Sequence, residues 1–177
     1  MFLVLTVLGD DRPGLVESIA QVIAFHDGNW LESRMARLAG KFAGILRASV
    51  PDTNVTALTT ALQRLETHGL RVMIDWSASD ALTQDYRYMT LNVLGTDRVG
   101  IIRGIAQSLA RRGINIDELH TEYTSAPMSG EMLFKATAYL RVPLQVMSAD
   151  LQESLEKLAH DLMVDITLAD LSAQTPE

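Results

Sequence analysis

The chain has 177 residues, enough for one large domain or two small ones, and 47% of them are apolar, so a sizeable core can be buried. Its 22 acidic residues against 15 basic ones give a net charge of −7, which argues against direct nucleic-acid binding, because phosphates must be neutralised by lysines and arginines. The absence of cysteine excludes disulfides, thiolate metal sites and thiol catalysis. It also favours a cytoplasmic protein, as does the lack of a basic leader before the short apolar start.

One block of sequence occurs twice. Residues 5–15 (LTVLGDDRPGL) return as residues 91–101 (LNVLGTDRVGI), and further along residues 42–51 match residues 134–143. The shift in register places a six-residue insertion near residues 125–131, which we interpret as a longer hairpin loop. Because the order of every element recurs as well, we interpret the chain as two packed domains that arose by duplication.

The elements of the first copy follow from residue spacing in chain order. Alternation and helical periodicity predict a strand over residues 2–8, a helix over 13–26, a hairpin of strands over 29–38 and 42–50, a helix over 55–65 that closes near Gly69, and a strand over 72–76. The order βαββαβ is the ferredoxin-like motif, an antiparallel four-stranded sheet with both helices on one face. We therefore predict an α+β fold with a first domain at 1–78, a linker at 79–85, a second domain at 86–171 and a tail at 172–177.

The loop after the first strand of each copy is one candidate binding site. Residues 9–14 (GDDRPG) and 95–100 (GTDRVG) lead into a helix, whose free backbone N–H groups and positive dipole end favour a small carboxylate. The alternative is a tight turn followed by a helix that Asp11 or Asp97 caps.

A second candidate is the asparagine just past the first helix of each copy. The side chains of Asn29 and Asn115 both donate and accept hydrogen bonds, so either suits the ammonium or carboxylate of an amino acid. The alternative is that each asparagine only ends the helix or forms a turn.

No catalytic or cofactor motif is present. His26, His68 and His160 lie near predicted helix ends and His120 in a predicted strand, so the histidines form no metal-ligand constellation. Dinucleotide, Walker and serine-nucleophile signatures are also missing. We therefore expect neither a metal nor a cofactor, and no enzymatic activity.

The βαββαβ unit with a D-R-P-G turn after its first strand resembles the ACT domain, a small-molecule-sensing module. The resemblance covers both copies. In the first it rests on residues 9–14, Asn29, residues 32–36 (ESRMA) and Phe42, and in the second on residues 95–101 and 113–116 (GINI). Two ACT domains in tandem with nothing attached are similar to the family of glycine cleavage system transcriptional repressors.

The resemblance implies an amino-acid site between two modules. Carried over by position, the site uses eleven residues: Asp11, Arg12, Pro13, Gly14, Leu15 and Asn29 of the first copy, and Asp97, Arg98, Gly100, Ile101 and Asn115 of the second. The copies differ at two places: the second has Val99 where the first has Pro13, and the first has Trp30 where the second has Ile116. One of the two sites is therefore expected to be altered or closed.

The same resemblance implies a function. Such repressors act through a DNA-binding activator protein, and glycine relieves the repression, so we expect an amino-acid-sensing, indirect repressor of the glycine cleavage system that contacts neither nucleic acid nor membrane. The alternative is a detached regulatory subunit of an amino-acid-metabolism enzyme, followed by an enzyme in its own right. Exposed sheet edges leave a homodimer open.

Overall fold

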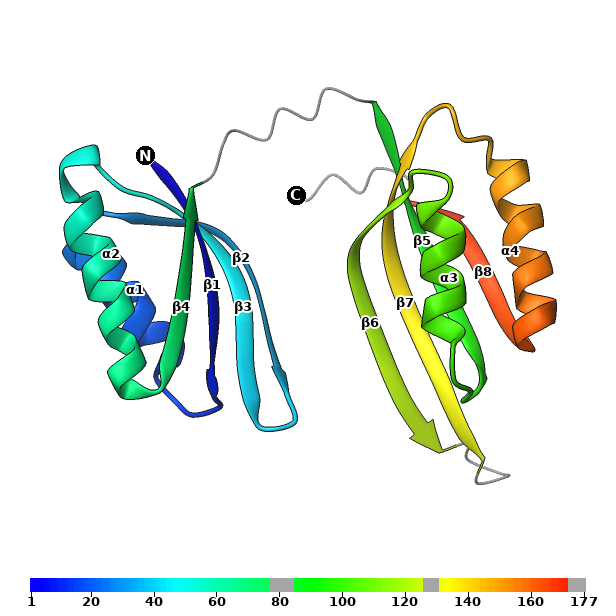
Figure 1. Ribbon diagram of the computed structural model, residues 1–177, viewed down its shortest axis with the longest axis horizontal. Helices are drawn as coiled ribbons and strands as arrows, with labels where there is room; N and C mark the ends of the chain where they lie inside the picture. The colour runs from blue at the N-terminus through cyan, green and yellow to red at the C-terminus, as the bar shows by residue number, and fades with distance from the viewer. Residues whose placement is uncertain (77–84, 126–130, 172–177) are drawn as a thin grey trace. The chain divides into compact units, whose positions relative to one another are not determined.

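The computed structural model describes residues 1–76, 85–125 and 131–171. The chain divides into two compact units, Met1–Ala81 and Leu82–Glu177. Figure 1 shows that each unit is a sheet with two helices on one face, α1 and α2 in the first and α3 and α4 in the second. The expected tail at 172–177, most of the expected linker at 79–85 and the centre of the expected insertion, residues 126–130, lie outside the described residues.

The first unit has the expected element order with two short 3₁₀ turns, η1 and η2, added around its second helix. Its elements are β1 (Phe2–Asp10), α1 (Leu15–Phe25), β2 (Asn29–Leu38), β3 (Lys41–Ser49), η1 (Asp52–Asn54), α2 (Val55–Arg64), η2 (Leu65–His68) and β4 (Leu70–Trp76). The sheet order is β2-β3-β1-β4 with every neighbouring pair antiparallel.

The second unit repeats this order. Its elements are β5 (Tyr86–Thr96), α3 (Ile101–Ala110), β6 (Asn115–Ser125), β7 (Met132–Pro143), α4 (Ser148–Leu162) and β8 (Val164–Asp170). The sheet order β6-β7-β5-β8 matches that of the first unit. The predicted α+β class with two tandem ferredoxin-like units is therefore confirmed.

Alternating burial explains why each sheet packs against helices on one face. In β1 the side chains of Leu3, Leu5 and Val7 are fully buried, whereas those of Phe2 and Leu8, which flank this set and point to the other face, are exposed. The helices contribute stripes at helical spacing, such as Leu15, Ile19 and Ile23 of α1 and Ile101, Ile105 and Leu109 of α3. The two resulting cores share no residue.

The sheet faces that point away from the helices differ in polarity. In the first unit Ile45 and Met73 flank Thr6 across the sheet, and they are 55% and 67% exposed. In the second unit the same places belong to Thr137 and Thr167, which flank Asn92. The Thr137 hydroxyl donates to the side-chain amide oxygen, Oδ1, of Asn92 at 2.9 Å. The described outer face is thus apolar at the centre of one sheet and polar at the centre of the other.

Candidate functional site

The loop after β1 is tied to the sheet by two ion pairs. Lys41 at the start of β3 pairs with Asp10, and Arg37 Nε lies 2.5 Å from Asp11 Oδ2. The hydrogen bond and the charge of Lys41 lower the pKa of Asp10, as expected for a carboxylate held ionised by a cation rather than for a catalytic acid. The backbone N–H of Asp11 also donates to the Gly40 carbonyl at 2.9 Å.

The proposed aspartate caps are wrong. Gly14 and Gly100 occupy the cap positions of α1 and α3 in left-handed conformations, with φ of 89° and 100°, and no side chain caps either helix. Glycine suits both positions because it adopts positive φ without a steric penalty. Helix α1 begins at Leu15, so Pro13 precedes the helix instead of forming its first turn. Asp11 is turned to Arg37, a partner that local spacing does not reveal.

In the second unit the equivalent loop keeps its backbone contact but not its ion pairs. The N–H of Asp97 donates to the Met132 carbonyl at 3.1 Å, as Asp11 does to Gly40. Thr96 and Leu133 stand where Asp10 and Lys41 pair in the first unit. Within the described part of the chain, Arg98 has no hydrogen-bond or ion-pair partner.

The two predicted asparagines begin β2 and β6, and the second is already engaged. Asn115 Nδ2 donates to Asp117 Oδ1 at 2.5 Å, and Asp117 also pairs with Arg141 at 3.1 Å. Both strands have a register shift at this point, which leaves one residue of each strand without a partner on the neighbouring strand. That residue is Asp117 in the second unit and Leu31 in the first. The side chain of Asn29 therefore has no neighbouring carboxylate of this kind and remains exposed.

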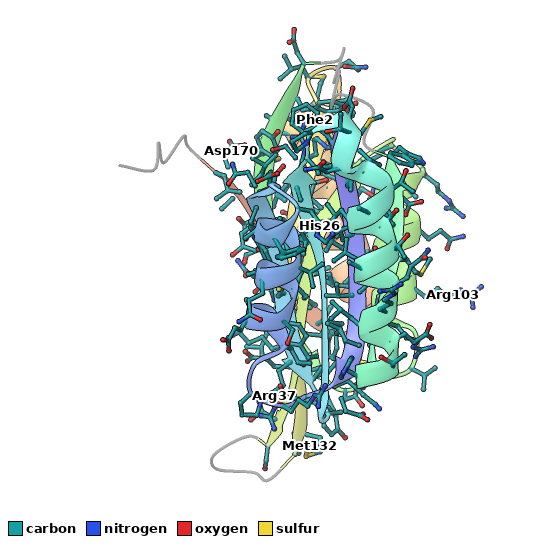
Figure 2. All side chains as sticks on the ribbon, turned by 90° about the vertical axis from the view of Figure 1, so that its left-hand side faces the viewer. Phe2, His26, Arg37, Arg103, Met132 and Asp170 are labelled. Atoms are coloured by element: carbon teal, nitrogen blue, oxygen red, sulfur yellow. The ribbon has the colours of Figure 1, made fainter. Side chains whose placement is uncertain are left out.

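Within one unit, the loop and the asparagine lie at opposite ends of the sheet. Asn29 is level with Ser49 and Phe2, whereas Asp10 is level with Lys41. Eight strand residues separate those levels, about 27 Å at about 3.4 Å per residue. Figure 2 shows Phe2 and Arg37 at the two ends of the first unit. No single unit can therefore bring both predicted groups to one small ligand.

The predicted residues Arg12 and Leu15 line a cavity of about 260 Å³ in the helical layer of the first unit. Six further residues complete its wall: Ser18, Gln21 and Val22 of α1, Leu65 and His68 of η2, and Leu70 of β4. An Arg12 Nη2 group donates to the His68 carbonyl and fixes the guanidinium at this wall. These six residues could not be predicted from the sequence, because they come from three elements that meet only after folding. The helical spacing of Ser18, Gln21 and Val22 is the one local signal that they share a face.

The described residues contain no cluster of three or more metal-ligating side chains. None of the described helices is long and apolar enough to cross a membrane.

The comparisons with known proteins fit this geometry. The family model of the ACT domain matches residues 1–75. The first unit is an ACT domain. An unknown protein from Galdieria sulphuraria has a similar structure, with a TM-score of 0.85 and 29% identity over 96% of this chain and 98% of that one. Among curated proteins, none matches the sequence.

A second solved structure is similar over the same length. It is described as a "putative glycine cleavage system transcriptional repressor", with a TM-score of 0.71 and 25% identity over 97% of this chain and 98% of that one. The second unit has the strand order and helix placement of the ACT unit. The chain therefore has the fold of a tandem ACT protein, and ACT domains are regulatory modules.

Proposed function

We propose that this chain is an amino-acid-sensing regulatory protein that represses the glycine cleavage system indirectly, by binding a DNA-binding activator protein in the cytoplasm. The observation that carries the proposal is the full-length similarity of both units to the candidate glycine cleavage repressor. A regulatory role also agrees with the match of residues 1–75 to the ACT family model.

The charge distribution supports a protein partner over DNA. The chain carries a net charge of −7, yet Arg98, Arg103 and Arg111 beside and on α3 are exposed, and none has an ion-pair partner within the described ranges. Figure 2 labels Arg103, whose side chain extends away from the ribbon. Three arginines are few against the roughly 6–10 phosphate contacts of a DNA-binding protein. They suffice to steer an acidic protein surface.

Affinity capture with the full-length chain tests this function. We expect a DNA-binding transcription factor to be retained, and Arg103→Glu to weaken its retention. Arg64→Glu in α2 is the matched control, because Arg64 is an exposed helical arginine of the first unit. Retention of a metabolic enzyme instead would support a detached regulatory subunit. A shift of glycine cleavage operator DNA by the purified chain alone would overturn the indirect mechanism.

Isothermal titration with amino acids tests the sensing part of the proposal. Glycine is the expected effector, and the eleven residues predicted from the family resemblance, from Asp11 to Asn115, remain the proposed site. Binding of glycine with loss of the captured activator would support both steps. Binding of other amino acids without glycine would remove the glycine assignment but leave the sensor.

A further inference from the structure

The helical layers of the two units differ in the space between the start of the first helix and the end of the second. In the first unit this space is the cavity of about 260 Å³ lined by Arg12 and His68. Its apolar wall is formed by four side chains: Leu15, Val22, Leu65 and Leu70. The cavity approaches the roughly 300–1,000 Å³ of small-molecule sites.

In the second unit leucines occupy the equivalent space. A Cβ atom added to Gly104, the counterpart of Ser18, would lie 3.3 Å from Leu162 Cδ1 and 3.5 Å from Leu158 Cδ1. Leu162 directly precedes the left-handed residue that ends α4, as His68 directly precedes the left-handed Gly69 in the first unit. The first unit thus has an open space beside Ser18 and His68. In the second unit, Gly104 and Leu162 stand at these positions and the leucine fills the space.

The polar groups of the cavity match the two charges of an amino acid. One of the five N–H donors of Arg12 goes to the His68 carbonyl, and the others suit a carboxylate. Ser18 Oγ donates to the Gly14 carbonyl and Gln21 Nε2 donates to Glu17, at 2.8 and 3.1 Å. With these donors already used, the Ser18 and Gln21 side-chain oxygens remain as acceptors for an ammonium group.

We propose that the cavity of the first unit binds one α-amino acid with an aliphatic side chain, and that the second unit has no equivalent site. The inference rests on the proposed function only in taking an amino acid as the ligand class. Arg12 holds the carboxylate, the Ser18 and Gln21 oxygens accept from the ammonium group, and the leucine wall takes the side chain. Glycine has no side chain to bury against that wall and binds there more weakly.

Titration of the full-length chain with L-leucine, L-valine, glycine and L-leucinamide tests the proposal. We expect leucine or valine to bind with one site per chain. Leucinamide lacks the carboxylate and should bind with an affinity at least about tenfold lower, because a charge-assisted hydrogen bond contributes about 1.5–3 kcal/mol. Two equal sites per chain, or equal binding of leucine and leucinamide, would overturn it.

Variants separate the cavity from other places on the chain. Arg12→Gln and His68→Leu should each weaken leucine binding about tenfold or more, the second by filling the space as Leu162 does. Arg64→Gln is the matched control, since Arg64 is an exposed arginine of the same unit that does not line the cavity, and this change should leave binding unchanged. Arg12 and His68 are exposed, so neither change removes core packing, and the unfolding midpoint of each variant confirms that it is folded.

The outcomes distinguish failure of this inference from failure of the proposed function. Leucine binding that depends on Arg12, in a chain that captures no transcription factor, keeps the cavity and removes the repressor function. Capture of an activator by a chain that binds glycine but neither leucine nor valine keeps the function and removes the cavity.

Discussion

The two units share a topology and a core pattern but differ in the loop after their first strand, in the helical layer and on the outer face of the sheet. The first has an open cavity between its helices and an ion-paired loop after β1. In the second, leucines fill the space and the counterpart loop lacks those pairs. The units repeat their buried core positions, on which folding depends. They differ at surface positions, in the cavity and in the loop after the first strand. The two units therefore present different surfaces on one shared scaffold.

The largest expected effect compares Gly9 with Gly95, two glycines at the same place in the two first strands. A Cβ on Gly9 would lie 2.7 Å from the Gly69 carbonyl oxygen, whereas one on Gly95 would lie 2.7 Å from a methyl group of Val164. A backbone carbonyl moves less readily than a side-chain methyl. We expect Gly9→Ala to lower the free energy of unfolding by about 2–3 kcal/mol and Gly95→Ala by about 1–2 kcal/mol.

Urea unfolding measures the free energies of this pair of variants, because the fluorescent side chains report on the two units separately. Both tryptophans, Trp30 and Trp76, belong to the first unit, and all four tyrosines belong to the second. Gly9→Ala should shift the tryptophan transition and Gly95→Ala should leave it in place. Equal costs for the two variants would show that the Gly69 turn yields as easily as a side chain.

The outer sheet faces give a second comparison with a smaller effect on stability. The double variant Ile45→Thr/Met73→Thr copies the polar centre of the second sheet onto the first, and Thr137→Ile/Thr167→Met does the reverse. Each should change the free energy of unfolding by less than about 0.5 kcal/mol per site. Fluorescence of a bound apolar dye should fall in the first variant and rise in the second, because the dye binds exposed apolar surface. Unchanged dye binding in both would show that neither face is the dye site.

The smallest effect is a pH dependence that each unit shows through a different carboxylate. Lys41 lowers the pKa of Asp10 below its ordinary value of 3.8 in the first unit, and Lys157 lowers that of Glu153 below 4.5 in the second. A lowered folded-state pKa adds stability that is present above the ordinary value and is lost as the pH falls through the lowered one. Asp10→Asn should thus slightly destabilise the tryptophan-reported transition at neutral pH and have no effect in strong acid.

Glu153→Gln is the counterpart of that variant in the second unit. It removes an i,i+4 pair with Lys157 at 2.6 Å, so its small effect should appear in far-ultraviolet circular dichroism and not in the tryptophan signal. A difference between Asp10→Asn and the unmodified chain that persists below the lowered pKa would rule out the ion pair as its cause.

The fold was predictable because its signals are local and occur twice. The GDDRPG and GTDRVG blocks, the alternation in β1 and the helical spacing of Leu15, Ile19 and Ile23 are each visible within a dozen residues. The copies also support each other, since an ambiguous helix in one has a clearer counterpart in the other. The two 3₁₀ turns beside α2 could not be predicted, because segments of three and four residues are too short to show a periodic pattern of apolar residues.

The site was less predictable because its contacts join distant residues. Asp11 was expected to cap α1 but pairs with Arg37, which the β2–β3 hairpin places beside it. The cavity joins Arg12 to His68, two residues that are 56 positions apart. The separation of Asn29 from the loop follows only from the strand register, which one sequence does not determine.

The separate cores of the two units have a consequence for how this chain can change in evolution. No buried residue belongs to both cores, so a substitution that loosens one packing arrangement leaves the other intact. Either unit can therefore accumulate substitutions, or lose a binding function, without a compensating change in its neighbour. The filled space beside Gly104 is what such independent drift produces, and related chains should include the reverse case, with the second space open and the first filled.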